Sequence, residues 1–176
     1  WYSLRNARCA MLNGRDDSLV LTLSGFSIGM AAQDSASAFS ALEAALAVSP
    51  SSAVTYILGG VIFGWAGEAE KAIEWGERAI RLSPFDPWAF STYHALTLGH
   101  FRLGHFDEAV KGAFKAVQSN PAHSISYMLL AAALVTADRF NDARGAAQTV
   151  LELQPSLQLH QKLPRGNFAQ WQVCYV

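Results

Sequence analysis

Three histidines lie close together in the sequence and are the first candidates for chemistry, because imidazole is a common metal ligand and general base. They are His94, His100 and His105, so their spacings are six and five residues. Two ligands on one helix face require a spacing of three or four residues, as in the HExxH zinc motif. The spacing therefore argues against a metal site, and we expect none.

The sequence also lacks the arrangements that are typical of enzymes. It contains no GxSxG nucleophile motif, no glycine-rich phosphate loop and no HExxH. Four acidic residues occur together, at the spacing of the solvated face of an amphipathic helix: Glu68, Glu70, Glu74 and Glu77. We therefore predict no catalytic residues and no cofactor in this chain.

The composition restricts the class of protein. Hydrophobic residues make up 51% of the 176 residues and charged residues 15%, with a formal net charge of −1. A disordered chain needs low hydrophobicity and high net charge, and nucleic-acid or anionic-lipid binding needs a basic field. The longest apolar runs, 53–67 and 124–137, are shorter than the roughly 18 residues that span a membrane. We expect neither nucleic acid nor a membrane as a partner.

The two cysteines, Cys9 and Cys174, lie near opposite ends of the chain and form no CxxC pair. Two such thiols do not make a disulfide framework, which favours a reducing, cytoplasmic location. The chain begins at Trp1 without an initiator methionine, so we expect it to be a fragment of a longer protein.

The chain is built from a repeated structural element, because its prolines recur at a constant spacing. Pro50 and Pro84 are 34 residues apart, as are Pro87 and Pro121, and Pro121 and Pro155. A three-residue insertion after Pro84 interrupts the period. A period of 34 residues resembles that of the tetratricopeptide repeat, in which each unit is a pair of helices.

The residues within each unit fit the same resemblance. Aromatic and small residues recur in the first helix, a glycine in the turn, and alanines followed by proline in the second helix. The matching residues are Gly25, Phe26, Ala38, Leu42, Ala45 and Pro50 in the first unit; Tyr56, Gly59, Gly60, Phe63, Gly67, Ala72, Ala79 and Pro84 in the second; Tyr93, Leu96, Gly104, Phe106, Ala109, Ala116 and Pro121 in the third; and Tyr127, Leu130, Phe140, Ala143, Val150 and Pro155 in the fourth. Gly67 and Gly104 are expected in the left-handed conformation that ends a helix.

We therefore predict an all-α fold, a right-handed superhelical solenoid of helix-turn-helix repeats forming a single array. The repeats are expected at about 19–50, 53–84, 90–121 and 124–155. Residues 1–18 are expected to be the remnant of a preceding helix, and residues 156–176 a capping helix and tail.

A further resemblance rests on one segment, Arg81–Pro87, which reads Arg-Leu-Ser-Pro-Phe-Asp-Pro. It is similar to the tetratricopeptide region that lies C-terminal to the catalytic or DNA-binding domain in bacterial adenylate/guanylate cyclases and winged-helix regulators. The resemblance implies a larger bacterial signalling protein as the parent. The chain itself shows no strand-rich region that would form a cyclase domain.

The first helices of the repeats are expected to line the concave face of the array, and that face is strongly apolar. The candidate partner-binding residues are Val54, Ile57, Val61, Trp65, His94, Leu98, Phe101, Arg102, Ile125, Met128, Ala132 and Val135, with Leu23, Ser27 and Met30 from the degraded first unit. Repeat domains that clamp acidic tails carry Lys, Asn and Arg here, so we predict no such clamp.

An apolar groove of this kind favours a non-catalytic scaffold that binds a protein partner. Its occupant is an apolar or amphipathic segment of a partner, a second copy of the chain in a homodimer, or the chain's own tail around Phe168 and Trp171. Two alternatives stay open: tighter packing could bury the face as core, or the chain could be a fragment of an enzyme with unrecognised catalytic residues.

Overall fold

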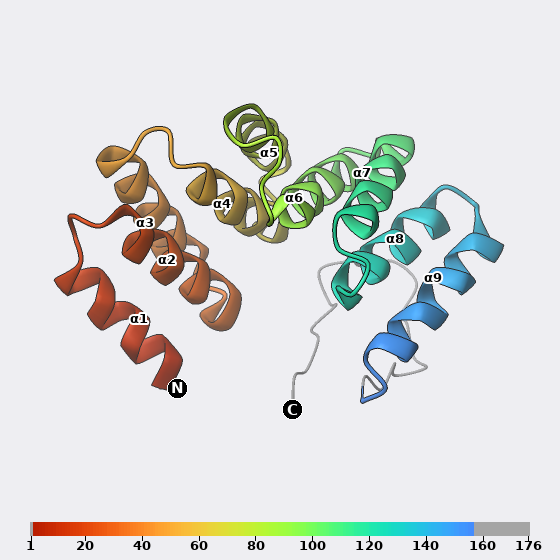
Figure 1. Cartoon of the computed structure of the whole chain (residues 1–176), viewed down its shortest axis with the longest axis horizontal. Helices are drawn as coiled ribbons and strands as arrows, with labels where there is room; N and C mark the ends of the chain where they lie inside the picture. Colours follow the sequence, from red (N-terminus) through yellow and green to blue (C-terminus); the bar gives the residue numbers. More distant parts are fainter. Residues whose placement is uncertain (1, 157–176) are drawn as a thin grey trace.

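A computed structural model describes residues 2–156, which form helices joined by short turns and contain no strand (Figure 1). The helices are α1 (Tyr2–Asn13), α2 (Ser18–Ala32), α3 (Ser35–Val48), α4 (Ala53–Ala66), α5 (Ala69–Leu82), α6 (Ala89–Arg102), α7 (Phe106–Ser119), α8 (Ser124–Thr136) and α9 (Phe140–Leu153). They follow one another along an arch, with α1 and α9 at its ends and α5 and α6 at its crown. The predicted all-α solenoid is confirmed.

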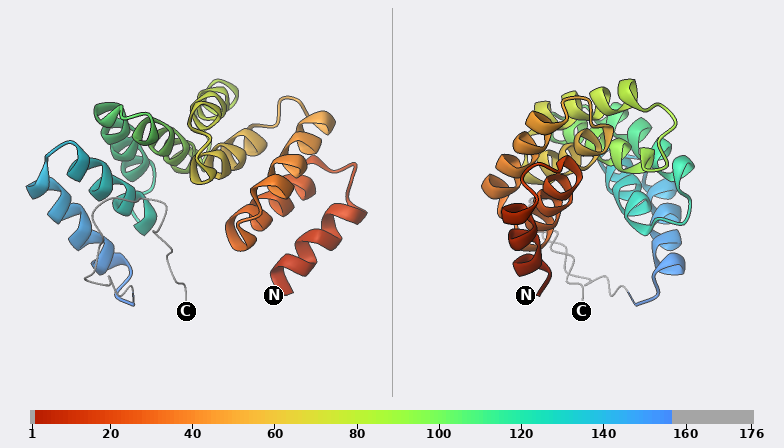
Figure 2. Two further views of the ribbon diagram at one scale, coloured as in Figure 1. Left: turned by 180° about the vertical axis from the view of Figure 1, so that it is seen from behind. Right: turned by 60° about the vertical axis from the view of Figure 1, so that its left-hand side comes forward.

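Helices α2 to α9 form four hairpins, and α1 packs on α2. The first helices of the hairpins, α2, α4, α6 and α8, contact one another in succession and form the inner layer of the arch (Figures 1 and 2). The second helices, α3, α5, α7 and α9, form the outer layer. Each outer helix except α9 also packs on the inner helix of the next hairpin, so the core continues from one hairpin to the next.

The turn inside each hairpin uses one residue with a positive φ angle. These residues are Gln33 (54°), Gly67 (95°), Gly104 (75°) and Asp138 (58°). In the last three hairpins the following amide donates to the carbonyl oxygen five residues earlier at 2.9 Å, which closes the inner helix. The left-handed conformation predicted for Gly67 and Gly104 is confirmed, and Gln33 and Asp138 take the equivalent positions, which the sequence pattern does not predict.

An aromatic cluster fills the core between the first two hairpins. The rings of Phe39 and Phe63 stack at 4.5 Å, and Trp75 meets Phe63 at 4.7 Å and Tyr56 at 5.1 Å, both edge to face. The Trp75 ring occupies the space that a side chain at position 59 would need, so Gly59 allows α5 to pack closely on α4.

The insertion after Pro84 lengthens one connection between hairpins. Residues 83–88 join α5 to α6 with six residues, whereas residues 49–52 and 120–123 make the equivalent connections with four. The Asp86 carboxylate accepts the amide of Trp88 at 2.9 Å and fixes a turn, while the side chain of Phe85 is 95% exposed. The predicted irregularity therefore lies in a connection and leaves the helices at their usual length.

Two further expectations concern the membrane and the ends of the chain. Within residues 2–156 no helix is long and apolar enough to cross a membrane. The predicted tail, including Leu157, Phe168, Trp171 and Cys174, lies outside the described residues.

Candidate interaction surface on the inner helices

The two layers of the arch differ in charge. Helices α2, α4 and α8 contain no Asp, Glu, Lys or Arg, and α6 contains only Arg102, at its last position. The outer helix α5 alone carries six charged residues: Glu70, Lys71, Glu74, Glu77, Arg78 and Arg81. Desolvating the inner layer on partner binding therefore costs little, because almost no charge must leave water.

Four of the predicted groove residues are core residues in the structure, which corrects their assignment to an open surface. Ile57, Val61, His94 and Leu98 are each no more than 6% exposed. The open alternative, that packing buries part of this face, holds for these four positions. The cause is the close approach of the inner helices at the crown of the arch.

Gly60 and Gly64 of α4, together with Gly67 that caps the helix, produce that close approach. They face three residues of α6, and the pairs are Gly60 with Ala95, Gly64 with Leu98, and Gly67 with Arg102. A Cβ atom built on each glycine would lie 3.1 Å from the Ala95 Cβ, 2.9 Å from the Leu98 Cβ and 3.4 Å from an Arg102 guanidinium nitrogen. Helices that approach so closely leave no room for a partner between them.

The other eight predicted residues remain at least partly accessible. Val54, Trp65, Phe101, Ile125, Met128 and Ala132 are half-buried, and Arg102 and Val135 are exposed. On α2, Leu23 and Met30 are exposed as well, together with Leu19, which the sequence analysis missed. The accessible apolar residues thus gather on α2 and α8, on either side of a closed centre.

A polar contact joins the inner helices at each side of that centre. The hydroxyls of Thr22 on α2 and Thr55 on α4 lie 2.7 Å apart, and both residues are buried. Between α6 and α8, the Nε2 atom of His94 lies 2.8 Å from the Oγ atom of Ser126, which lies 3.3 Å from Nδ1 of His123. Burial, followed by the nearby His123, lowers the pKa of His94 from 6.5 to about 3.

A pattern in the sequence indicates these contacts. A hydroxyl residue follows the repeat proline by five positions in three units: Thr55 after Pro50, Thr92 after Pro87 and Ser126 after Pro121. All three hydroxyl residues are buried. A polar residue at a fixed register in an apolar helix points to a structural hydrogen bond.

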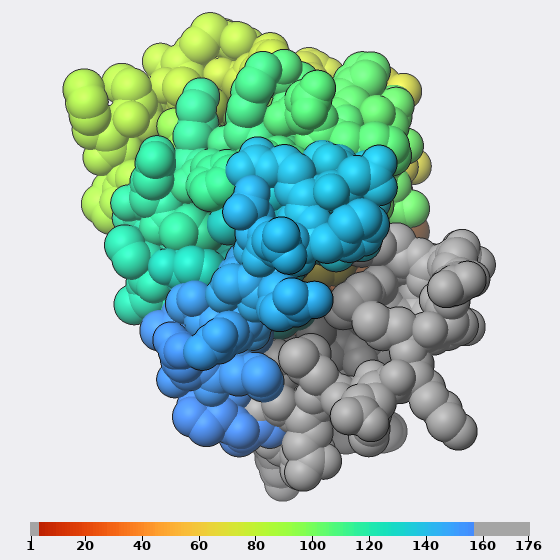
Figure 3. Space-filling model, turned by 90° about the vertical axis from the view of Figure 1, so that its right-hand side faces the viewer, coloured from red at the N-terminus to blue at the C-terminus, as the bar shows by residue number. Residues whose placement is uncertain are grey.

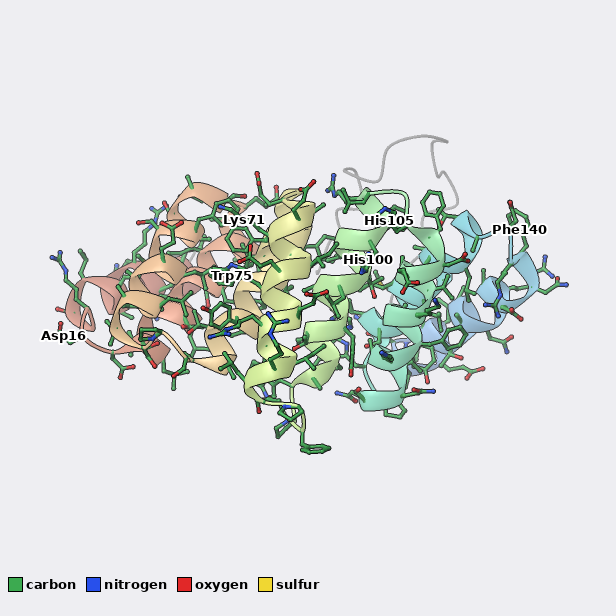
Figure 4. The ribbon with its side chains drawn as sticks, turned by 90° about the horizontal axis from the view of Figure 1, so that it is seen from above. Asp16, Lys71, Trp75, His100, His105 and Phe140 are labelled. Atoms are coloured by element: carbon green, nitrogen blue, oxygen red, sulfur yellow. The ribbon has the colours of Figure 1, made fainter. Side chains whose placement is uncertain are left out.

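Two of the histidines considered for metal binding do meet in space. The rings of His100 and His105 lie 5.8 Å apart where α6 ends and α7 begins, as Figure 4 shows from above. Burial, and then His105, lower the pKa of His100, and its Nδ1 atom has no hydrogen-bond partner among the described residues. Within residues 2–156, however, no three His, Cys, Asp or Glu side chains lie close enough to hold a metal ion.

Two small cavities lie beside α6. The first, about 170 Å³, is lined by Tyr93, Leu96, His100, Glu108, Lys111, Gly112 and Lys115. The second, about 330 Å³, is lined by Phe101, Arg102, Gly104, Phe106 and Thr136. The second cavity places the one charge of the inner layer beside two phenylalanine rings.

The last outer helix ends the array without a following hairpin in the described part of the chain. Figure 3 looks at this end and shows α9 running along the surface. Phe140, Leu151 and Leu153 of α9 are exposed.

The repeat pattern of the chain matches that of a known family. A family model described as a tetratricopeptide repeat matches residues 30–87 and 95–157, more than half of the chain. The comparison with curated proteins found no match to this chain.

The fold is similar to that of solved structures of MamA. A crystal structure of MamA protein has a TM-score of 0.62 and 19% identity, and the match covers 92% of this chain and 87% of that one. MamA 41-end from Desulfovibrio magneticus RS-1 has a TM-score of 0.66 and 19% identity, with coverages of 87% and 84%. At this identity the likeness shows the fold alone.

Proposed function

Since the chain belongs to the tetratricopeptide repeat family, we propose that it is a non-catalytic scaffold that binds an apolar or amphipathic helix of a protein partner. The observation that carries the proposal is the inner layer, which presents exposed apolar side chains and a single charge. The contact surface comprises the accessible residues of α2 and α8, with Val54 and Trp65 of α4 and Phe101 and Arg102 of α6.

The stripe on α8 has the spacing that suits a partner helix. Ile125, Met128, Ala132 and Val135 follow one another at intervals of three and four residues, so they lie on one helix face. A second helix buries its own stripe against such a face, as in helix-in-groove recognition. Methionine adapts to different partner side chains, because its side chain is unbranched and flexible.

Matched valines test the proposal. Val135 on the inner helix α8 is 48% exposed, and Val48 on the outer helix α3 is 45% exposed. We expect Val135→Glu to weaken binding of a fluorescent amphipathic helical peptide by about tenfold or more, because it places a charge in an apolar contact. Val48→Glu should leave binding unchanged. Equal effects of the two substitutions in fluorescence anisotropy would contradict the proposal.

A matched pair of leucines extends the test to the other end. Leu23 on α2 is 43% exposed and Leu151 on α9 is 42% exposed. If a partner spans both ends of the inner layer, Leu23→Glu weakens binding and Leu151→Glu does not. The thermal unfolding of all four variants serves as the control for folding.

Three occupants of the surface can be distinguished by experiment: a partner protein, a second copy of the chain and the chain's own tail. Light scattering separates the first two, since a dimer that dissociates in Val135→Glu would assign the surface to self-association. Truncation after Pro164 tests the third. Increased peptide binding by the truncated chain would make the tail the occupant, and unchanged binding would exclude it.

The setting of the scaffold is also part of the proposal. The segment Arg81–Pro87 supports a place in a larger, cytoplasmic bacterial signalling protein such as an adenylate cyclase-like protein. Its Phe85 side chain projects from the connection and offers a contact for a neighbouring domain. Loss of regulation in a full-length parent that carries Phe85→Ala would support this setting.

One cluster favours an enzyme fragment as the alternative. Ser126 lies between two imidazoles, an arrangement that a nucleophile and its base would also adopt. Ser126 is completely buried, so a substrate would reach it only after α6 and α8 separate. A serine-reactive fluorophosphonate that labels Ser126 in the folded chain would favour the alternative over the scaffold.

A further inference from the structure

Arg102 is the one arginine of the inner helices α2, α4, α6 and α8. Arg8, Arg81 and Arg139 each form an ion pair with a carboxylate, at 3.9, 3.7 and 2.7 Å. The side chain of Arg102 is exposed and forms no ion pair or hydrogen bond with any residue between 2 and 156. Its guanidinium rests over Gly67, so packing places it, and its donors have no acceptor in this part of the chain.

The surroundings of Arg102 are apolar. It lines the cavity of about 330 Å³ with Phe101, Phe106 and Thr136, and the rings of Phe101 and Phe106 lie 6.0 Å apart. The side chains of Leu103, Phe106 and Val135 are all exposed. A guanidinium with apolar neighbours is less well hydrated than one in open water, which strengthens its interaction with a carboxylate.

The position of Arg102 relative to the apolar stripe matters as well. The stripe on α8 ends at Val135, and the next residue, Thr136, lines the same cavity as Arg102. A helix that packs along the stripe therefore comes to Arg102 at one end. The inner helices hold no other charged residue. A negatively charged group of the partner would therefore bind at Arg102 and at no other point of the inner layer.

We propose that Arg102 and the adjoining cavity bind one carboxylate side chain on the apolar face of a partner helix. Charge complementarity carries the choice of occupant: the only charge of the inner layer is positive and lacks a partner among the described residues. The inference rests on the proposed function and adds to it the chemistry of the partner. An Asp or Glu side chain forms bidentate hydrogen bonds with guanidinium, which also fixes the register of the bound helix.

The test uses two amphipathic helical peptides that differ at one position of the apolar face, one with Glu and one with Gln. The unsubstituted chain should bind the Glu peptide about tenfold more tightly, since hydrogen bonds to charged groups are the stronger ones. Arg102→Met keeps the apolar stem and removes the charge, so it should lose this preference while it still binds the Gln peptide. Raising the salt concentration should reduce the preference, because ion pairs are screened.

Arg144→Met is the matched control, since Arg144 is an exposed arginine on the outer helix α9. It should leave the preference for the Glu peptide intact. A charge exchange gives a second variant: Arg102→Glu should prefer a peptide with Lys at the same position.

The outcomes separate the two proposals. Equal binding of the Glu and Gln peptides, with both weakened by Val135→Glu, would overturn the role of Arg102 and leave the scaffold in place. Failure of both peptides to bind would overturn both. Retention of the Glu preference in Arg102→Met would also overturn the inference.

Discussion

The two polar contacts of the inner layer occupy equivalent places in the array and behave differently with pH. Between α2 and α4, Thr22 and Thr55 join two hydroxyls that do not titrate, 2.7 Å apart. Between α6 and α8, His94 and Ser126 join an imidazole to a hydroxyl at 2.8 Å. Geometry and burial are alike, but only the second contact contains a group that acid can charge. One half of the arch should therefore be sensitive to pH and the other insensitive.

The two contacts also differ in how well they are satisfied. The Thr22 hydroxyl contacts the Ser18 carbonyl at 2.7 Å, and that of Thr55 contacts the Ser52 hydroxyl at 2.8 Å. His94 has Ser126 as its hydrogen-bond partner, and its other close neighbours are the rings of Phe90 and His123. Removal of one partner should thus cost more at α6–α8 than at α2–α4.

The largest expected effect is that of acid on the α6–α8 contact. The native state keeps His94 neutral, with its pKa lowered to about 3, whereas the unfolded state takes up a proton below its ordinary pKa of 6.5. The contribution of neutral His94 to the free energy of unfolding is fully present above pH 6.5. It falls by about 1.4 kcal/mol per pH unit as the pH drops toward 3. Urea denaturation at pH 7 and pH 4.5 should show a loss of about 2–3 kcal/mol.

The lowered pKa of His123 adds to this loss in the same direction, because burial also disfavours the protonated form of that imidazole. At pH 4.5 the amide protection factors, which correct for the intrinsic exchange rate, should fall more in α8 and α9 than in α2 and α3. A uniform loss of protection along the arch would show that the two contacts do not differ.

The next largest effect is expected for Ser126→Ala at pH 7. The substitution leaves the buried His94 imidazole without its hydrogen-bond partner, which costs about 1–3 kcal/mol. Urea denaturation measures the free energy of unfolding. A loss below about 0.5 kcal/mol would mean that His94 finds another partner.

A smaller effect is expected for Thr55→Val, the matching change at the other contact. The Thr22 hydroxyl keeps the Ser18 carbonyl as its acceptor, and valine has the shape of threonine, so the loss should be about 0.5–1 kcal/mol. This loss should not change between pH 7 and pH 4.5. A strong pH dependence would remove the distinction between the two halves.

The smallest effect extends the comparison to the turns. The α4–α5 turn uses Gly67 at φ 95°, whereas the α8–α9 turn uses Asp138 at φ 58°. A left-handed conformation strains a residue with a Cβ atom, but glycine also adds entropy to the unfolded chain, so Asp138→Gly should raise the melting temperature with a gain of only about 0.5 kcal/mol. Gly67→Ala should lower it. A lower melting temperature for Asp138→Gly would show that the Asp138 side chain stabilises the turn.

The repeat architecture could be predicted because it depends on features that are local in sequence. The spacing of Pro50, Pro84, Pro121 and Pro155 sets the length of each hairpin, and Gly67 and Gly104 mark two of the turns. The insertion after Pro84 was located for the same reason. Gln33 and Asp138 were missed, because residues other than glycine adopt a positive φ only where the surrounding hairpin holds them there.

The candidate surface could be predicted only in part. Sequence register correctly assigned Arg102 and Val135 to accessible positions, since periodicity fixes the direction in which a side chain leaves a helix. It could not give the distance between α4 and α6, which decides that Ile57, Val61 and Leu98 are buried. The pairing of His94 with Ser126 was also missed, because the two residues lie 32 positions apart.

The sequence by itself determined the helical hairpins, their period and the near-absence of charge from the inner layer. These follow from propensity, periodicity and composition, which act over a few residues. Only the tertiary structure decided that Gly60, Gly64 and Gly67 close the centre of the arch, and that the side chain of Arg102 is left without a partner among the described residues. Such features depend on contacts between helices, where a difference of one ångström determines whether a side chain is core or surface.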